Sequence, residues 1–130
     1  MDKIKAINKE VKNFYKKSSN ECMRMWFYEN HVLVVKKYSE EISRKTGANT
    51  EITVLAALLH DIARSWNVWD DPDLMKESLK KAEEIMKKHK YSSKNIEAVK
   101  KAIILHGCHD KLPDTKEGKV IATADAMAHL

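Results

Sequence analysis

The stretch Ile52-Thr-Val-Leu-Ala-Ala-Leu-Leu-His-Asp-Ile-Ala-Arg64 is the most apolar segment of this 130-residue chain. It has almost no polar face, which is typical of a helix that other helices surround. We therefore expect a helix over residues 51–63 at the centre of the fold, capped by Asn49 or Thr50. A polar pair, His60–Asp61, lies inside this segment. An ionised carboxylate is unfavourable there unless a partner such as a divalent cation neutralises it.

The sequence on both sides of this segment predicts further helices, because apolar residues recur at helical spacing and no alternating strand pattern competes. These helices cover residues 1–17, 21–46, 73–89, 92–106 and 117–130. The inward face of residues 21–46 would contain Phe27, His31, Val34, Val35, Tyr38 and Ile42. Gly47 suits the end of that helix. The predicted fold class is all-α, a compact single-domain bundle of about six helices over residues 1–130.

The composition is that of a soluble globular protein, with 43% apolar and 33% charged residues. The net charge of +5 comes from 21 Lys and three Arg, many of them on the expected helix faces. A solvated surface is the simplest explanation of this charge. It also allows an anionic partner such as a nucleotide or nucleic acid, although no nucleic-acid recognition motif accompanies it.

The chain has no apolar run of about 18 residues and no signal-peptide pattern at its start, so we expect a cytoplasmic protein without a membrane partner. Cys22 and Cys108 lack metal or redox spacing and are interpreted as reduced thiols. The last predicted helix stops at Leu130, within an apolar pattern. Either a partner covers that end or the natural chain continues. The sequence does not indicate whether the protein is a monomer or an oligomer.

A His-Asp pair is by itself a weak signal. Six His and eight Asp in 130 residues give roughly 0.4 such pairs by chance. A second pair, His109–Asp110, lies among turn formers, where polar residues need no special explanation. Only the pair His60–Asp61 is embedded in an apolar segment.

Two further polar residues interrupt apolar faces of other predicted helices, His31 and Asp125. Each alone has an ordinary explanation: a buried His bonded to a carbonyl or carboxylate, and a buried Asp that caps a helix or pairs with a cation. Together with the His-Asp pair they form a mixed nitrogen and oxygen set. Such a set suits manganese, iron, cobalt, nickel, magnesium or zinc, and leaves positions for water and a substrate oxygen on an octahedral ion.

This ordered pattern resembles the HD-domain superfamily of metal-dependent phosphohydrolases. The resemblance covers about Trp26 to Leu130 and is strongest in Leu58-Leu-His-Asp-Ile-Ala63 and Ile121-Ala-Thr-Ala-Asp125. It implies an all-helical, HD-domain-like fold, one divalent metal ion, and hydrolysis of a phosphate ester or anhydride. A nucleotide or another small phosphorylated metabolite is the expected substrate. Because the superfamily also includes nucleic-acid and signalling-nucleotide hydrolases, membership does not identify the substrate.

The chain departs from the superfamily's pattern at several positions. Members with two metals often have His-Glu where this chain has Lys76-Glu77, which favours one metal. Guanosine-tetraphosphate hydrolases show an acidic pair soon after His-Asp, where this chain has Arg64-Ser65. The five-prime nucleotidase type has Glu at the position of Arg64. Neither of these substrate classes is therefore indicated.

The resulting hypothesis is a site with one metal ion, held by His31, His60, Asp61 and Asp125, in which the ion lowers the pKa of a bound water. The expected catalytic residues are Asp61, His106 and Arg64. Arg64, or Lys76, would neutralise charge that develops on the phosphate, although a surface ion pair explains Arg64 equally well.

His106 matches a position where related proteins often have His, and it is the candidate for proton transfer. It could instead contact a second metal or a phosphate, or bond to helix-terminal carbonyls. Trp26, Trp66 and Trp69 could form the wall of a base pocket, although aromatic core packing is the commoner role.

Two other functions compete with this hypothesis. One is a small zinc site formed by His106, Cys108 and His109, which lacks a clear fourth ligand. The other is a non-catalytic HD module that binds a nucleotide or a protein partner. Turnover of phosphorylated compounds would distinguish the enzyme from the module.

Overall fold

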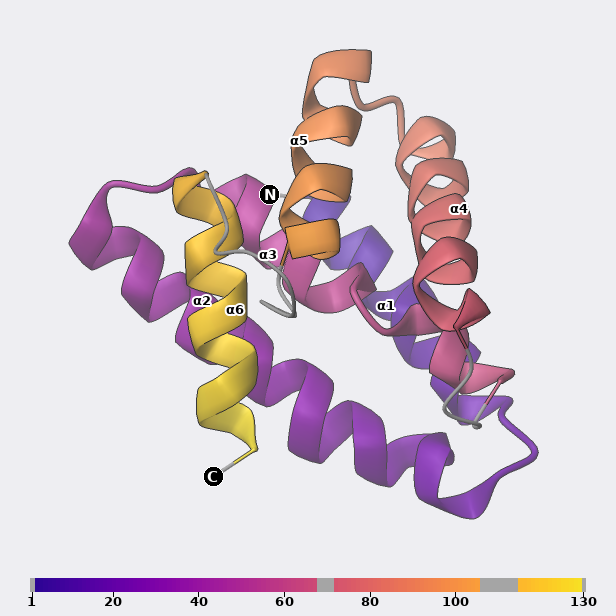
Figure 1. Ribbon diagram of the computed structural model, residues 1–130. Coiled ribbons are helices and arrows are strands. Elements are labelled where there is room, and N and C mark those ends of the chain that lie inside the picture. Colours follow the sequence, from indigo (N-terminus) through magenta and orange to yellow (C-terminus); the bar gives the residue numbers. More distant parts are fainter. Residues whose placement is uncertain (1, 68–71, 106–114, 130) are drawn as a thin grey trace.

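A computed structural model describes residues 2–67, 72–105 and 115–129 of the chain (Figure 1). Within these ranges the chain forms six α-helices, and none of the described residues belongs to a strand. The helices are α1 (Asp2–Lys16), α2 (Leu33–Thr46), α3 (Thr50–Leu59), α4 (Asp73–Lys88), α5 (Ser93–Leu105) and α6 (Lys116–Ala128). The predicted all-α fold class is therefore confirmed.

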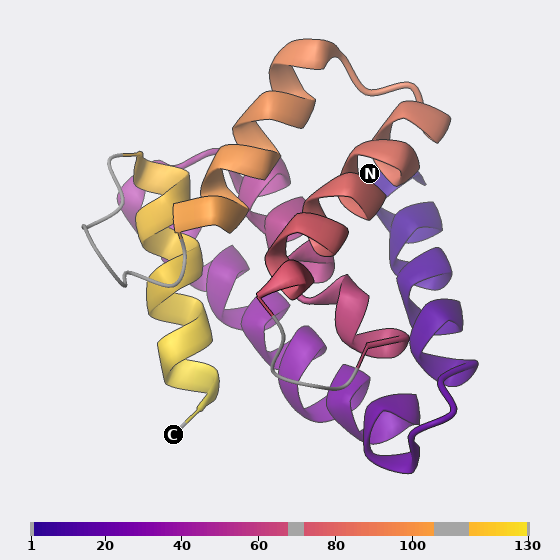
Figure 2. The ribbon, with the colours of Figure 1, turned by 45° about the vertical axis from the view of Figure 1, so that its right-hand side comes forward.

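Helix α3 lies at the centre of the fold, as its apolar sequence predicts. Its residues from Ile52 to Leu59 are all buried, and each of the other five α-helices contacts it. Figures 1 and 2 show the other helices packed around it. Asn49 is the N-cap, because its side-chain oxygen accepts a hydrogen bond from the N–H of Ile52 at 3.2 Å.

The helix α3 ends earlier than predicted, and a short 3₁₀ helix, η3 (Ile62–Ser65), replaces its last turn. Asp61 lies between the two, and its backbone is no longer helical, with φ −119° and ψ 19°. Side chains of other helices bond to backbone groups at this break. Ser78 of α4 accepts a hydrogen bond from the N–H of Ala63 at 3.0 Å, and Tyr15 of α1 donates one to the carbonyl of Asp61 at 2.9 Å.

The segment predicted as one helix over residues 21–46 is helical throughout, but its first half is π-helical. Two π-helical stretches, η1 (Cys22–Trp26) and η2 (Tyr28–Val32), precede α2. Because a π turn is wider than an α turn, the buried face shifts by a residue. Tyr28 and Val32 are fully buried, whereas Phe27, which the predicted face contained, is only partly buried. His31 and Val35 are buried as predicted.

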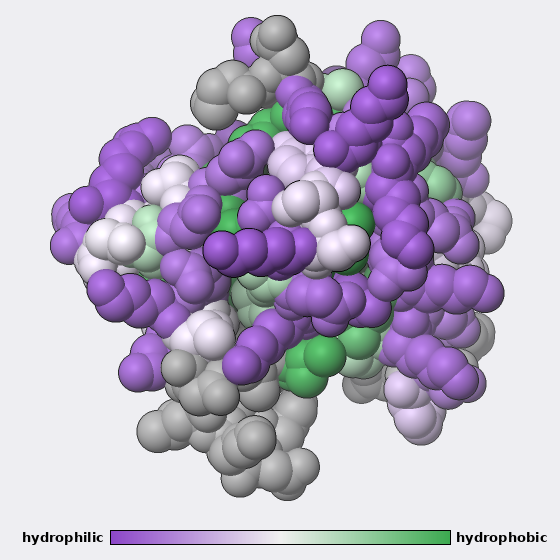
Figure 3. Space-filling view, turned by 90° about the horizontal axis from the view of Figure 1, so that it is seen from above, coloured by the Kyte–Doolittle hydropathy of each residue, from purple (hydrophilic) through white to green (hydrophobic). Residues whose placement is uncertain are grey.

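Hydrophilic side chains cover most of the face seen from above, and apolar ones show only in gaps between them (Figure 3). A groove of about 860 Å³ runs between α4 and α5, with Met75, Leu79 and Ile104 among apolar lining residues and Lys76 and Lys80 beside them. This distribution agrees with a solvated surface as the explanation of the net charge. None of the helices in the described ranges has both the length and the apolar composition of a membrane span.

Two neighbouring isoleucines of α5 test this description of the core. Ile103 is fully buried, whereas Ile104 is 53% exposed. Ile103→Ala should lower the free energy of unfolding by about 2–5 kcal/mol, because it leaves a cavity between packed helices. Ile104→Ala should cost less than about 1 kcal/mol. Urea unfolding followed by circular dichroism measures both, and equal losses in the two variants would contradict the placement of α5.

Candidate metal centre

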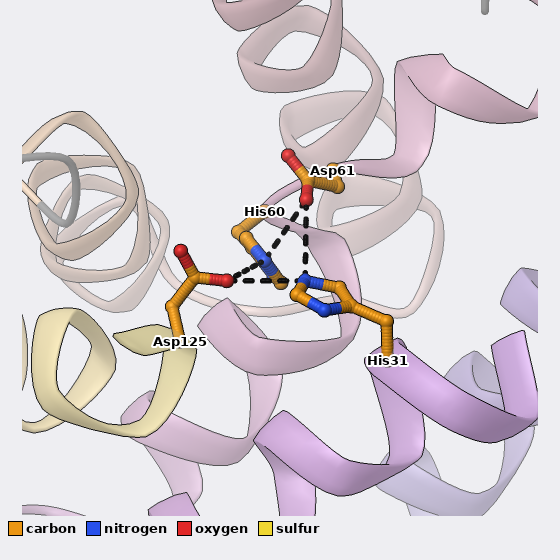
Figure 4. Close-up of side chains that lie close together, drawn as sticks. All are labelled: His31, His60, Asp61 and Asp125. Carbon is orange, nitrogen blue, oxygen red and sulfur yellow. Dashed lines mark ion pairs between the residues drawn. The ribbon is translucent and has the colours of Figure 1, made fainter. Parts of the chain in front are cut away.

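Four side chains from three separate parts of the chain meet at the C-terminal end of α3 (Figure 4). His31 comes from η2, His60 and Asp61 follow α3, and Asp125 comes from α6. The Nε2 atom of His31 lies 3.0 Å from Asp125 Oδ1 and 3.6 Å from Asp61 Oδ2. The Nε2 atom of His60 lies 3.3 Å and 3.2 Å from the same two oxygens. The structure thus brings together the four residues named as metal ligands from the sequence.

The spacing of these atoms fits a single metal ion. Ligands about 2.1 Å from one ion lie roughly 3.0 Å apart at right angles and roughly 3.4 Å apart at tetrahedral angles. The four nitrogen-to-oxygen distances span 3.0–3.6 Å, and all four ligand atoms lie within 4.8 Å of one another. The two nitrogens and two oxygens alternate around a common point (Figure 4). The donor set and its spacing therefore suit a divalent transition metal or magnesium.

The break after α3 explains how two sequence neighbours face the same point. In a regular α-helix, adjacent side chains point about 100° apart, so His60 and Asp61 would diverge. The non-helical backbone at Asp61 turns its carboxylate toward the imidazole of His60. The end of the helix is therefore part of the site.

The ring of His60 is oriented by a hydrogen bond on the side away from the cluster. Its Nδ1–H donates to the carbonyl of Ala57, one turn earlier in α3, at 2.8 Å. This bond fixes the ring, so that Nε2 points at the two carboxylates and, in the neutral imidazole, carries the lone pair. The ring of His31 packs against that of Phe27, with centroids 4.8 Å apart.

The histidines lie on the protein side of the cluster and the carboxylates on the solvent side. The His60 side chain is fully buried and that of His31 is 8% exposed, whereas the carboxylates are 22% and 20% exposed. A ligand could therefore approach the cluster past Asp61 and Asp125. Such access is what a site that binds both an ion and a substrate needs.

The four groups shift one another's pKa values. Burial lowers the pKa of His60, but Asp61 and Asp125 outweigh burial and raise it to about 10. Burial also lowers the pKa of His31, and hydrogen bonds to Asp125 and Asp61 raise it above its usual value. For Asp61, burial raises the pKa, while His60 and His31 hold it well below its usual range. Without a metal ion, the carboxylates therefore favour the protonated form of both imidazoles, and the imidazoles favour the ionised form of Asp61.

Two further side chains border the cluster. The Nε atom of Arg64, in η3, lies 3.7 Å from Asp61 Oδ1, and its side chain is 28% exposed. The ring edge of His129 lies against the ring of His31, with centroids 4.8 Å apart, while its Nδ1–H donates to the carbonyl of Asp125 at 2.7 Å. Arg64 thus forms an ion pair, one of its two expected roles, and the other, contact with a phosphate, stays a prediction.

Tyr15 is the residue at this site that the sequence analysis missed. The sequence placed it on the apolar face of the first helix, and its side chain is indeed fully buried. Its hydroxyl donates to the backbone carbonyl of Asp61 at 2.9 Å, and burial raises the pKa of that hydroxyl well above its usual value. Nothing in the local pattern around residue 15 indicates a partner 46 residues away.

Several other predicted residues lie elsewhere or outside the described ranges. His106, Cys108, His109 and Trp69 are outside the described residues, and with them the proposed proton donor and the alternative zinc site. Lys76 lines the groove between α4 and α5. Trp26 is 63% exposed, and Trp66 packs against Phe14 while donating a hydrogen bond to Glu77.

Comparison with known families gives one match. The sequence model of the HD-domain family matches residues 28–130, which include His31, His60, Asp61 and Asp125. Neither the curated proteins nor the solved structures gave a significant match.

The raised pKa of His60 predicts how the stability of the metal-free protein depends on pH. Because the folded pKa of about 10 exceeds the usual 6.5, the contribution of this proton is fully present below about pH 6.5 and is lost as the pH rises toward 10. After chelation, the free energy of unfolding should fall by on the order of 3 kcal/mol over this range. The His60→Asn variant, measured by urea unfolding at the same pH values, should lack this part of the fall. Parallel curves for the two proteins would contradict the charge state inferred here.

Proposed function

This chain belongs to the HD-domain family, and we propose that it hydrolyses a phosphate ester or anhydride with the help of one divalent metal ion. The family generally consists of metal-dependent phosphohydrolases. The observation that carries the proposal is the convergence of two imidazole nitrogens and two carboxylate oxygens, 3.0–3.6 Å apart, at one partly open point. We propose a small phosphorylated metabolite, such as a nucleotide, as the substrate.

The ligands in this proposal are His31, His60, Asp61 and Asp125. An ion bound there supplies a water of lowered pKa and positive charge beside the phosphate oxygens. The Lys76-Glu77 pair in α4, where members with two metals often have His-Glu, supports a single ion.

Arg64 is the residue proposed to bind the phosphate. It lies next to the proposed ligand Asp61 and remains partly exposed, so a substrate at the ion would have access to its guanidinium. A guanidinium can donate two parallel hydrogen bonds to a phosphate, which both orients the group and stabilises charge that develops on it. Asp61 would then hold the ion with its Oδ2 atom and pair with Arg64 through its Oδ1 atom. His106 remains the proposed proton donor to the leaving group.

Loss of a ligand should abolish metal binding. Wild-type protein should bind about one equivalent of Mn²⁺ or another divalent ion, and His60→Asn should weaken binding by at least about 100-fold, because the buried Nε2 is lost. His89→Asn is the matched control, because His89 follows the last residue of α4 and bonds to Glu10 of α1, not to the four proposed ligands. Isothermal titration calorimetry measures the affinity of each protein for the ion, and elemental analysis measures the amount of bound metal.

The same proteins should then be tested for hydrolysis of p-nitrophenyl phosphate and nucleotides with Mg²⁺, Mn²⁺, Fe²⁺, Co²⁺, Ni²⁺ and Zn²⁺. We expect turnover with at least one ion, lost in His60→Asn and retained in His89→Asn. Metal binding without turnover under every condition would favour the non-catalytic module. Equal metal binding by wild type and His60→Asn would refute the site.

Replacement of Arg64 should affect the reaction more than metal binding. Arg64→Ala should lower kcat/KM by about 10–100-fold, because a charged contact to the phosphate is lost. Its metal affinity should change far less than that of His60→Asn. Arg44→Ala is the matched control, because Arg44 is exposed and pairs with Glu40 on α2. Steady-state kinetics test this role, and an unchanged kcat/KM in Arg64→Ala would rule it out.

A further inference from the structure

The segment Asp61–Trp66 carries both a proposed ligand and the proposed phosphate-binding arginine, and it is not regular helix. The backbone of Asp61 is not helical, and η3 follows it. Its backbone bonding is partly internal, because the N–H of Arg64 donates to the carbonyl of Asp61 at 2.9 Å and the N–H of Trp66 to that of Ala63 at 3.1 Å. The N–H of Ala63 donates instead to the side chain of Ser78 in α4. A segment of this kind needs contacts from elsewhere to keep one conformation.

Two consecutive side chains of α1 supply contacts at both ends of this segment. At its start, the hydroxyl of Tyr15 donates to the carbonyl of Asp61 at 2.9 Å. At its end, the ring of Phe14 packs on that of Trp66, with centroids 6.0 Å apart. The Nζ of Lys81 lies 5.5 Å from the Phe14 ring centroid and 5.9 Å from that of Trp66, which holds the pair from the side of α4. The helix α1 thus contacts the segment where it begins and where it ends.

The bond from Tyr15 bears directly on the geometry of the ligand. The backbone carbonyl of Asp61 can only accept, so the hydroxyl is the donor. The Tyr15 ring is fixed by its own packing, because it is fully buried and lies beside the rings of Phe27 and Tyr28. The rigid Tyr15 hydroxyl therefore bonds to Asp61, and the non-helical backbone of Asp61 directs its carboxylate at the histidines.

We propose that Tyr15 is a positioning residue of the metal centre, which holds Asp61 in the conformation that directs its carboxylate at the ion. This inference rests on the proposed metal site. The family match covers residues 28–130, and α1 precedes them. The hydrogen bond from Tyr15 to Asp61 therefore comes from a part of the chain outside the matched region. Hydrogen bonds that orient a ligand commonly change metal affinity by about 10–100-fold when they are removed.

The test is Tyr15→Phe, which removes one oxygen and keeps the packed ring. We expect its dissociation constant for Mn²⁺ to rise about tenfold by calorimetry. The absorption spectrum of the Co²⁺-loaded variant should also differ from that of the wild type, because the coordination of Asp61 is altered. Tyr28→Phe is the matched control: Tyr28 is equally buried, but its hydroxyl bonds to Asn8 of α1. Its Mn²⁺ affinity should stay within about twofold of the wild type.

Loss of stability alone does not produce this pattern. Both variants remove a buried hydroxyl bond, so both should lower the unfolding free energy of the metal-free protein by about 1 kcal/mol. Phe14→Leu loosens the other end of the segment and leaves every hydroxyl in place. It should weaken Mn²⁺ binding by a smaller factor, and if Tyr15→Phe does not fold, it tests whether contacts from α1 support the ligand geometry.

The outcomes separate this inference from the proposed function. If wild type binds Mn²⁺ and hydrolyses a phosphorylated compound, while Tyr15→Phe matches it in affinity and Co²⁺ spectrum, the role of Tyr15 is refuted and the proposed function stands. If wild type binds no divalent ion, both are refuted. A tenfold loss of affinity in Tyr15→Phe, with Tyr28→Phe unchanged, supports the positioning role.

Discussion

Two carboxylates and two imidazoles share one small space at the end of α3, and the charges in that space must balance. Without an ion, the carboxylates favour the protonated form of the histidines, which is why the pKa of His60 rises to about 10 despite its burial. With an ion, the metal takes the place of those protons, because nitrogen ligands must be deprotonated to bind. An ion bound by these four side chains, as we propose, would compete with those protons, and either would balance the charge of this buried cluster.

The rest of the fold can be understood from what this cluster requires. A central helix buried on every side brings His60 inside, and its early end turns Asp61 toward the same point. The neighbouring helices then bring His31 and Asp125 to that end, and α1 and α4 satisfy the backbone groups that the break exposes. The carboxylates are left on the solvent side. The stability of the bundle and the geometry of the site therefore depend on the same short stretch of chain.

The sequence was sufficient to predict the helices and to name the four side chains that the structure brings together. Apolar periodicity is a local signal, and it identified five of the six α-helices of the described residues, while an almost continuous apolar run identified the central one. The features that it did not predict depend on contacts distant in sequence or on departures from the regular α turn. Tyr15 and Ser78 bond to backbone groups at the break after α3, and the π-helical turns moved Tyr28 and Val32 into the core. The role of Tyr15 could not be predicted because its aromatic ring looks like any other core residue in the pattern.

The most direct test of the central claim is anomalous X-ray diffraction from crystals grown with Mn²⁺. The account predicts one strong anomalous peak in contact with His31 Nε2, His60 Nε2, Asp61 Oδ2 and Asp125 Oδ1. The absence of a peak at this point, or a peak at His106, Cys108 and His109 instead, would contradict it.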